Sequence, residues 1–249
     1  MVAHTNHVSF RQPASDSLNI WRYVELAKYL DLITSKTLFL ARSDILSDKF
    51  EGSTTHINTQ ATREIFEAQA HMPEMQISQV LANLGKVRTD MKQQVYVNCW
   101  HMSEFESEAM WTLYGRFGDA IAIRTQYSSV VRSLPESFYV GAVSYIDYKR
   151  QFIPDGNMLT PFMHKRLSFE HEKEVRILTW LPPSLEVPNY VNVEEFGLRI
   201  LVDLPKMIDE VYVAPDCPDW QYRLVAKISS EFLPGIPVKR SSLEDPAIF

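Results

Sequence analysis

The sequence has only two cysteines, Cys99 and Cys217, among its 249 residues. Two cysteines are too few for a disulfide framework, and this usage suits a reducing compartment. Residues 1–12 contain no apolar segment of the kind that a secretion signal requires. No other stretch approaches the roughly 18 apolar residues that span a bilayer. From these absences we predict a cytoplasmic protein that neither enters nor crosses a membrane.

Motifs for metal binding and for nucleotide hydrolysis are also absent. The seven histidines form no H-E-x-x-H and the two cysteines form no C-x-x-C. The chain has no G-x-S-x-G elbow and no G-x-x-x-x-G-K-[ST] phosphate loop. We therefore predict no metal site, and the sequence lacks the usual signatures of serine hydrolases and nucleotide triphosphatases.

Excess positive charge is missing as well, because the formal net charge is -6. Such a balance gives no overall attraction to nucleic-acid phosphates. The nearest basic patch, residues 164–166, is followed at once by Glu170, Glu172 and Glu174. We expect this patch to pair with its own neighbours, and we do not expect nucleic acid or a membrane as a partner.

Short apolar runs and amphipathic stretches together indicate an α+β fold. Leu26, Tyr29, Leu30 and Ile33 recur at helical spacing, and residues 219–232 are also helical in pattern. Consecutive strands beside segregated helices favour a mixed, largely antiparallel sheet over a doubly wound one. We expect strands at residues 20–23, 37–41, 95–102, 120–123, 139–146, 172–180, 190–193, 198–202, 210–214 and near 238.

Residues 58–92 are polar, rich in Gln, Glu and Ala, and lack strand-like alternation. This segment predicts two helices broken near Pro73, in an inserted helical lobe. A further short helix is expected at residues 159–167, with Pro161 in its first turn. No repeat and no linker rich in proline or glycine divides the chain, so we predict a single domain over residues 1–249.

The most informative stretch is FEHEKEVRIL, residues 169–178. On a strand, Glu172, Glu174 and Arg176 share one face while Val175 and Ile177 face the core. One carboxylate can hold a ribose hydroxyl and stabilise an oxocarbenium ion, while its neighbour orients or deprotonates a nucleophile. The alternative is a solvated strand face whose charges neutralise one another.

A second stretch, CWHMSEFESEAMWTLY, spans residues 99–114. Ser103 stands where a strand is expected to become a helix, with Glu106 three residues later, so it either caps that helix or helps to form an anion site at its free amides. Trp111 and Tyr114 either stack on a flat heterocycle or belong to the core. His101 is either a structural histidine or part of a binding site.

Arg22 lies inside the apolar run Ile20–Tyr23, where a charge needs a partner. It is either a fork for a phosphate or ribose, or the ion-pair partner of Glu172 or Glu174. The sequence leaves both open. The loop at residues 42–52 has the composition of a binding loop, although a helix-capping turn explains its serines and aspartates equally well.

Several blocks together resemble a known family: W-R-Y at residues 21–23, L-F-L-A-R-S-D-I-L-S-D-K-F-E-G at 38–52, C-W-H-M-S at 99–103, M-W-T-L-Y-G at 110–115 and E-K-E-V-R at 172–176. The family is an uncharacterised prokaryotic domain of unknown function, and some of its relatives resemble abortive-infection phage-defence proteins. The resemblance covers most of residues 20–240. Its usual loop block is closer to F-N-D-P-F, where residues 46–50 are L-S-D-K-F, and Val175 replaces a common aromatic residue.

The order of the motifs is similar, more distantly, to that of ADP-ribosyltransferases. Those enzymes carry an Arg or His on a first strand, then a serine-containing strand, then a late Glu-x-Glu or single Glu. The resemblance implies that Arg22 binds the diphosphate or ribose of NAD and that Ser103 supports the nicotinamide pocket. It implies further that Glu174 is catalytic and that Glu172 helps to select the acceptor. His101 and Met102 depart from the family's S-T-S triplet.

Three functions follow from these patterns. The leading hypothesis is an intracellular ADP-ribosyltransferase-like enzyme that cleaves the nicotinamide glycosidic bond of NAD, its substrate, as a possible phage-defence effector acting on a protein acceptor. The second is a non-catalytic domain that senses a small nucleotide or a phage protein, and the third a metal-independent nucleic-acid processing enzyme. We expect Glu174 and Glu172 to be catalytic, with the ligand bound by Arg22, His101, Ser103, Trp111, Tyr114 and Arg176.

Overall fold

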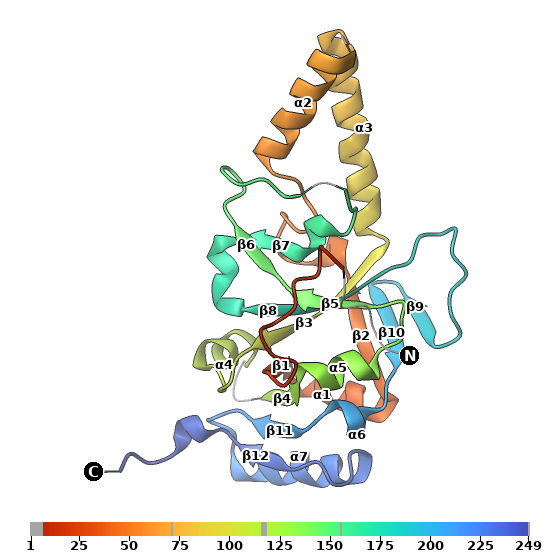
Figure 1. The fold of residues 1–249 in the computed structure, drawn as a ribbon. Coiled ribbons are helices and arrows are strands. Elements are labelled where there is room, and N and C mark those ends of the chain that lie inside the picture. Colours follow the sequence, from red (N-terminus) through yellow and green to blue (C-terminus); the bar gives the residue numbers. More distant parts are fainter. Residues whose placement is uncertain (1–6, 71, 116–118, 155, 249) are drawn as a thin grey trace.

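In a computed structural model, which describes residues 7–70, 72–115, 119–154 and 156–248, one ten-stranded mixed sheet organises the chain (Figure 1). Its strands are β1 (Asn19–Glu25), β2 (Thr37–Arg42), β3 (Val95–Met102), β4 (Ala120–Gln126), β5 (Tyr139–Ala142), β8 (Glu174–Trp180), β9 (Val191–Glu194), β10 (Gly197–Leu201), β11 (Glu210–Val213) and β12 (Val238–Arg240). Two further strands, β6 (Ser144–Ile146) and β7 (His164–Arg166), form a small parallel pair.

The order along the main sheet is β12-β11-β4-β1-β3-β2-β10-β9. All neighbours in this path are antiparallel except β11 and β12. The other edge of β3 pairs with β8 along residues 95–101, and β8 pairs in turn with β5. The sheet therefore branches at β3, and the α+β class with a largely antiparallel sheet is confirmed.

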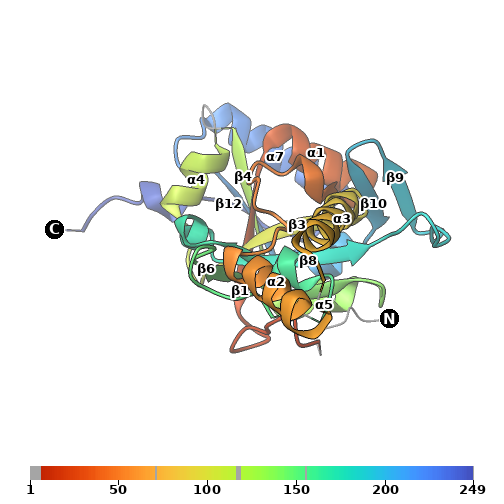
Figure 2. The same cartoon turned by 90° about the horizontal axis from the view of Figure 1, so that it is seen from above.

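Helices cover the sheet and extend from it. They are α1 (Leu26–Ser35), α2 (His56–Ala70), α3 (Glu74–Lys92), α4 (Glu108–Tyr114), α5 (Tyr127–Ser133), α6 (Leu204–Met207) and α7 (Asp219–Phe232), with 3-10 turns η1 (Ser43–Ile45), η2 (Thr160–Met163), η3 (Leu167–Glu172) and η4 (Ser242–Glu244). The hairpin of α2 and α3 projects from the sheet, and the view from above shows α1 beside α7 (Figures 1 and 2).

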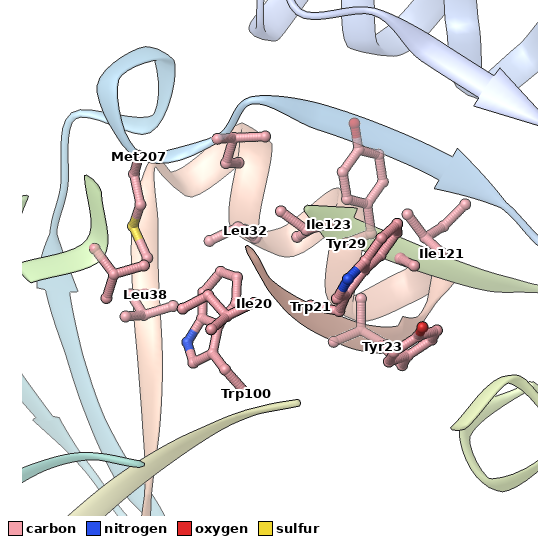
Figure 3. Close-up of a cluster of buried hydrophobic side chains, with 14 of the residues drawn as sticks. Ile20, Trp21, Tyr23, Tyr29, Leu32, Leu38, Trp100, Ile121, Ile123 and Met207 are labelled. Carbon is pink, nitrogen blue, oxygen red and sulfur yellow. The ribbon is translucent and has the colours of Figure 1, made fainter. Parts of the chain in front are cut away.

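The main hydrophobic core packs the sheet against side chains of α1 and α7 and also of α4, α5 and α6 (Figure 3). Residues 120–123 of β4 are all fully buried, as their continuous apolar run predicts for a strand covered on both faces. On α1, Tyr29, Leu32 and Ile33 are buried at helical spacing, and the hydroxyl of Tyr29 lies 2.6 Å from that of Ser229 on α7. This core holds β1 and β4 firmly in place.

Most of the expected elements are present, and the two helices expected within residues 58–92 are confirmed as α2 and α3. The strand expected at 139–146 is divided into β5 and β6, and the helix expected at 159–167 is wrong beyond η2, because residues 164–166 form β7. The division into domains stays a prediction. No helix within the described ranges is long and apolar enough to cross a membrane.

Two predicted element boundaries at the expected site are wrong. The strand expected from Glu172 begins at Glu174, because Lys173 has a left-handed φ of 39° and Glu172 ends η3. The helix expected to begin at Ser103 begins at Glu108 and is capped by Ser107, whose hydroxyl accepts from the amide of Met110. Neither Glu172 nor Ser103 therefore has the local setting that the sequence predicted.

Candidate functional site

A split in the sheet creates the candidate site. β1 pairs with β4 along its whole length, but its register with β3 covers only Ile20 and Trp21. β3 pairs with β2 at Val97 and Tyr96, so residues 98–100 lie between the two pairings on this edge. Neighbouring strands that diverge leave side chains and backbone groups facing the gap. Here the gap holds a cavity of about 310 Å³.

Both sides of the split contribute to the wall of this cavity, called the seam cavity below. Five of the expected site residues line it: Arg22 from β1, His101 from β3, Tyr114 from α4, Glu172 from η3 and Glu174 from β8. Apolar and amide side chains complete the wall, among them Phe39, Leu46, Val97, Asn98, Cys99, Trp100 and Met110. Two cations, Arg22 and Lys28, therefore share one concave surface with two carboxylates and several rings, as in many ligand sites.

Arg22 lies across the split. Its Nη1 donates to the carbonyl oxygen of Cys99 at 3.0 Å. Among the described residues no carboxylate lies within ion-pair distance of Arg22, so the expected alternative of a pair with Glu172 or Glu174 is wrong. Burial lowers the pKa of Arg22 from its usual value, yet a guanidinium keeps its proton at neutral pH. The cavity thus carries a positive charge without a bound counter-charge.

Glu174 belongs to a buried ionic network. Nε of Arg176 lies 2.8 Å from Oε1 of Glu174, and Nη1 of Arg176 lies 2.8 Å from Oε2 of Glu51. Lys165 lies 3.4 Å from Glu174. Burial opposes ionisation, but Arg176 and then Lys165 outweigh it and lower the pKa of Glu174 to about 2. Its oxygens are fully engaged by the protein.

Glu172 is the more accessible carboxylate. Its side chain keeps 20% of its surface exposed, against 3% for Glu174. Within the described ranges, Oε2 of Glu172 has a charged partner, the amine of Lys165 at 2.5 Å, and Oε1 has none. The network formed by Glu51, Glu172, Glu174, Lys165 and Arg176 contains three carboxylates and two cations. The network therefore has a formal charge of -1, and Glu172 is its most exposed carboxylate at the cavity wall.

Two further cavity residues are neutral. Nδ1 of His101 lies 2.7 Å from the carbonyl oxygen of Glu172, and burial lowers the pKa of the imidazole. Tyr114 keeps part of its ring exposed at the cavity wall, and burial raises the pKa of its phenol to about 12, with Cys99 and Glu172 adding to the effect. Both side chains can exchange hydrogen bonds with a ligand.

The remaining expected site residues do not line the seam cavity. The hydroxyl of Ser103 accepts from the amide of Phe105, and its carbonyl accepts from the indole of Trp21. Trp111 packs edge-on against Tyr23 and donates to Glu106. Arg176 lies behind Glu174 and is fully buried. Of these three residues, only Arg176 contacts a cavity residue through an ion pair.

Sequence patterns did not assign Lys165 or Glu51 to the site. Lys165 lies in the basic patch that was expected to pair with its own neighbours, and its ion pairs with Glu172 and Glu174 confirm that expectation. Glu51 comes from the loop at 42–52. Gly52 follows it with a left-handed φ of 64°, where a Cβ would lie 2.3 Å from the ring of Phe162. This turn directs Glu51 to Arg176.

A second cavity of about 430 Å³ adjoins the first. The two share Arg22, Val24, Lys28 and Phe39 in their walls. Arg199 lies over the ring of Phe39 at 5.4 Å. We call this space the outer cavity. The seam cavity and the outer cavity therefore form one groove that passes Arg22, and the ring of Phe39 lies where the two cavities meet.

No cluster of three or more histidine, cysteine, aspartate or glutamate side chains suited to a metal ion occurs in the described part of the chain. No family model matches the chain, and neither does any curated protein, so the family resemblance stays a prediction. Among solved structures, the fold is similar to that of DarT from Thermus sp. 2.9 in complex with ADP-ribosylated ssDNA. The alignment covers 93% of this chain and 96% of that chain, with 11% identity and a TM-score of 0.40.

Proposed function

We propose that the seam cavity binds NAD and that the protein cleaves the bond between nicotinamide and ribose, releasing ADP-ribose or passing it to an acceptor. One observation carries the proposal: Arg22, which has no carboxylate partner among the described residues, lies on one wall, and carboxylates from η3 and β8 lie on another. Guanidinium groups bind phosphates through paired hydrogen bonds. Carboxylates stabilise the oxocarbenium ion that forms when a glycosidic bond breaks.

Glu172 and Glu174 have different roles in this proposal. A carboxylate that stabilises developing positive charge needs a free oxygen facing the ligand. Glu172 has one, whereas both oxygens of Glu174 are engaged by Arg176 and Lys165. We therefore assign the ribose contact to Glu172, and to Glu174 the holding of Lys165, which in turn holds Glu172. The resemblance instead implied that Glu174 is catalytic and that Glu172 helps to select the acceptor.

The reaction follows from these positions. The bond from the ribose anomeric carbon to the pyridinium nitrogen breaks, and its electron pair leaves with neutral nicotinamide. Glu172 stabilises the sugar cation until an acceptor attacks its other face. Tyr114 offers a ring surface to the nicotinamide, and Arg22 holds the diphosphate.

The outer cavity suits the other half of the dinucleotide. It begins at Arg22 and Lys28, which would flank the diphosphate, and it contains the ring of Phe39. Aromatic side chains stack on nucleobases of any sequence. The adenosine of NAD would therefore lie between Phe39 and the loop that joins β9 to β10.

Incubation with NAD tests the proposal through the release of nicotinamide, measured by chromatography. Candidate acceptors, including protein and single-stranded DNA, are added in separate reactions that follow labelled ADP-ribose. Release that depends on Glu172 supports the proposed function. A role in phage defence belongs to this proposal through the family resemblance alone, and infection of cells with and without the protein tests it.

A second candidate is a domain that binds a nucleotide without turning it over. It is favoured by the ionic network, which neutralises most of the carboxylate charge and lowers the pKa of Glu174 to about 2. Such a network also has a structural role. Calorimetry that detects NAD binding with no nicotinamide release would favour this candidate.

A further inference from the structure

His101 is held in one tautomer. It lies on β3 at the last residue pair before β1 and β3 diverge, opposite Trp21 on one side and Glu174 on the other. Its Nδ1 is 2.7 Å from the carbonyl oxygen of Glu172. A carbonyl can only accept a hydrogen bond, so Nδ1 carries the proton. In the neutral ring, Nε2 is then an unprotonated acceptor.

Nε2 is the ring nitrogen of His101 that remains available to a ligand in the seam cavity, which this 5% exposed residue lines. No described group forms a hydrogen bond with Nε2, and this atom is not among the fully buried polar atoms that lack a partner. The imidazole lines the seam cavity and the ring of Tyr23 lies edge-on to it at 6.2 Å. A basic nitrogen therefore faces the same space as the two carboxylates.

The surroundings keep the imidazole neutral at pH 7. Burial lowers its pKa, the hydrogen bond to Glu172 opposes that effect, and the charges of Lys173 and His171 add to the lowering. The titratable groups that face it come from several elements: Tyr23 and Arg22 on β1, Cys99 on β3, Tyr114 on α4, His171, Glu172 and Lys173 at the end of η3, and Glu174 on β8.

We propose that Nε2 of His101 accepts the proton that the acceptor loses when it attacks the ribose. The inference rests on the proposed function and adds a residue to it. A hydroxyl or water forms a bond to the anomeric carbon, the bond to nicotinamide breaks, and nicotinamide leaves with that electron pair. The acceptor's proton passes to Nε2, and the imidazolium then returns it to solvent. Glu174 is too weak a base for this step.

Two substitutions separate this role from a structural one. His101→Asn keeps an amide that donates to the carbonyl of Glu172, and His101→Gln places an oxygen near Nε2 without its basicity. A positioned base contributes about 100-fold or more to a rate. We expect both variants to lose about 100-fold in kcat with a small change in KM. In the unchanged protein, kcat/KM should rise with pH and reach half of its plateau below the ordinary pKa of an imidazole, because burial lowers the pKa of His101. That rise should be absent from both variants.

If His101→Asn turns over at the unchanged rate and keeps the pH profile, the proposal is overturned. The role of His101 would then be limited to its hydrogen bond with the carbonyl of Glu172, which the asparagine keeps. If the unchanged protein releases no nicotinamide, the proposed function fails and the inference fails with it. Release that survives His101→Gln overturns the inference alone.

Carbethoxylation supplies a readout that needs no turnover. Diethyl pyrocarbonate modifies unprotonated, accessible imidazole nitrogen, and mass spectrometry locates the product. We expect His101 to react and NAD to protect it. His164 is the matched control, because its Nδ1 is also bound to a carbonyl, that of Thr160 at 2.8 Å, while its ring lies outside the seam cavity. An unreactive His101 would overturn the inference.

Discussion

Arg176 reaches back along β8 to Glu174, with Nε 2.8 Å from Oε1 and Nη2 3.0 Å from Oε2. The side chains keep 1% and 3% of their surface exposed. Nη1 and Nη2 of the same guanidinium also reach Glu51. Both charges lie where water hardly reaches, and Glu174 also contacts Lys165 at 3.4 Å. The loss of the Glu174 charge therefore leaves Arg176 with Glu51 as its carboxylate partner and weakens the pairing of two buried cations.

Glu174→Gln should therefore destabilise the protein. Removing one partner of a buried pair costs about 3 to 5 kcal/mol. Urea unfolding measures the free energy of unfolding. Glu194→Gln is the matched control, because Glu194 pairs with Arg199 and is 37% exposed, so its loss should cost about 1 kcal/mol or less. Equal losses for the two variants would contradict the prediction.

Acid should act through the same carboxylate. The pKa of Glu174 falls from an ordinary 4.5 to about 2 on folding, because Arg176 and Lys165 outweigh its burial. A depressed pKa means that its stabilisation is complete above the unfolded pKa and is lost as the pH falls toward the folded one. We expect unfolding free energy to drop between pH 4.5 and 2, and to drop less steeply in Glu174→Gln. Parallel pH profiles for the two proteins would contradict this.

Glu172→Gln should separate turnover from stability. Glu172 has one charged partner and an exposed edge, so its loss should cost about 1 kcal/mol of folding free energy. If it stabilises the sugar cation, nicotinamide release should fall by roughly 100-fold or more with little change in NAD affinity, because the contact acts in the transition state. Initial rates and calorimetry on the same preparation measure both. Unchanged turnover in a folded variant would remove Glu172 from the catalytic role.

Arg22→Gln should weaken NAD binding without weakening the fold. A hydrogen bond to a charged group contributes about 1.5 to 3 kcal/mol, which corresponds to roughly a 10- to 150-fold change in Kd. Arg22→Lys keeps the positive charge but loses the paired hydrogen bonds of a guanidinium. Its affinity for NAD should therefore lie between those of the unchanged protein and Arg22→Gln. Arg63→Gln, on the helical hairpin, is the control. Affinity equal to that of the unchanged protein would contradict a phosphate contact.

Phe39→Ala should distinguish the two halves of the ligand. Loss of a stacking ring costs about 1 to 3 kcal/mol per base, so NAD affinity should fall by roughly 5- to 150-fold. Nicotinamide mononucleotide lacks the adenosine half, and its affinity should stay the same. Phe152→Ala is the control, because Phe152 is exposed and lines neither cavity. An equal loss for both ligands would place adenosine elsewhere.

Sequence patterns predicted the sheet well where apolar runs are continuous. The bounds of β3, the buried run at residues 120–123 and the helix at 219–232 follow from local chemistry that the chain carries within a few residues. The secondary structure at Glu172 and Ser103 was predicted wrongly. Alternation predicted that Glu172 continues the strand, but the left-handed backbone of Lys173 breaks it, and local spacing gives no sign of that turn.

Long-range partners account for the rest of the differences. The embedded charge of Arg22 indicated a need for a partner, and that partner is a backbone carbonyl exposed where two strands diverge. Nothing near Arg176 in sequence points to Glu51, which lies 125 residues away and depends on the turn at Gly52. Such contacts are set by the packing of the whole sheet, which periodicity does not encode.

The two residue pairs that join β1 to β3 have a mechanical consequence. The part of the sheet that contains β4, β11 and β12 is held to the part that contains β8, β2 and β10 by few backbone hydrogen bonds at this point. A ligand that touches Arg22 and Glu172 together would add cohesion across the joint, and its binding free energy would oppose the separation of the two parts. A ligand in the seam cavity would therefore also make the sheet more rigid at the joint between β1 and β3.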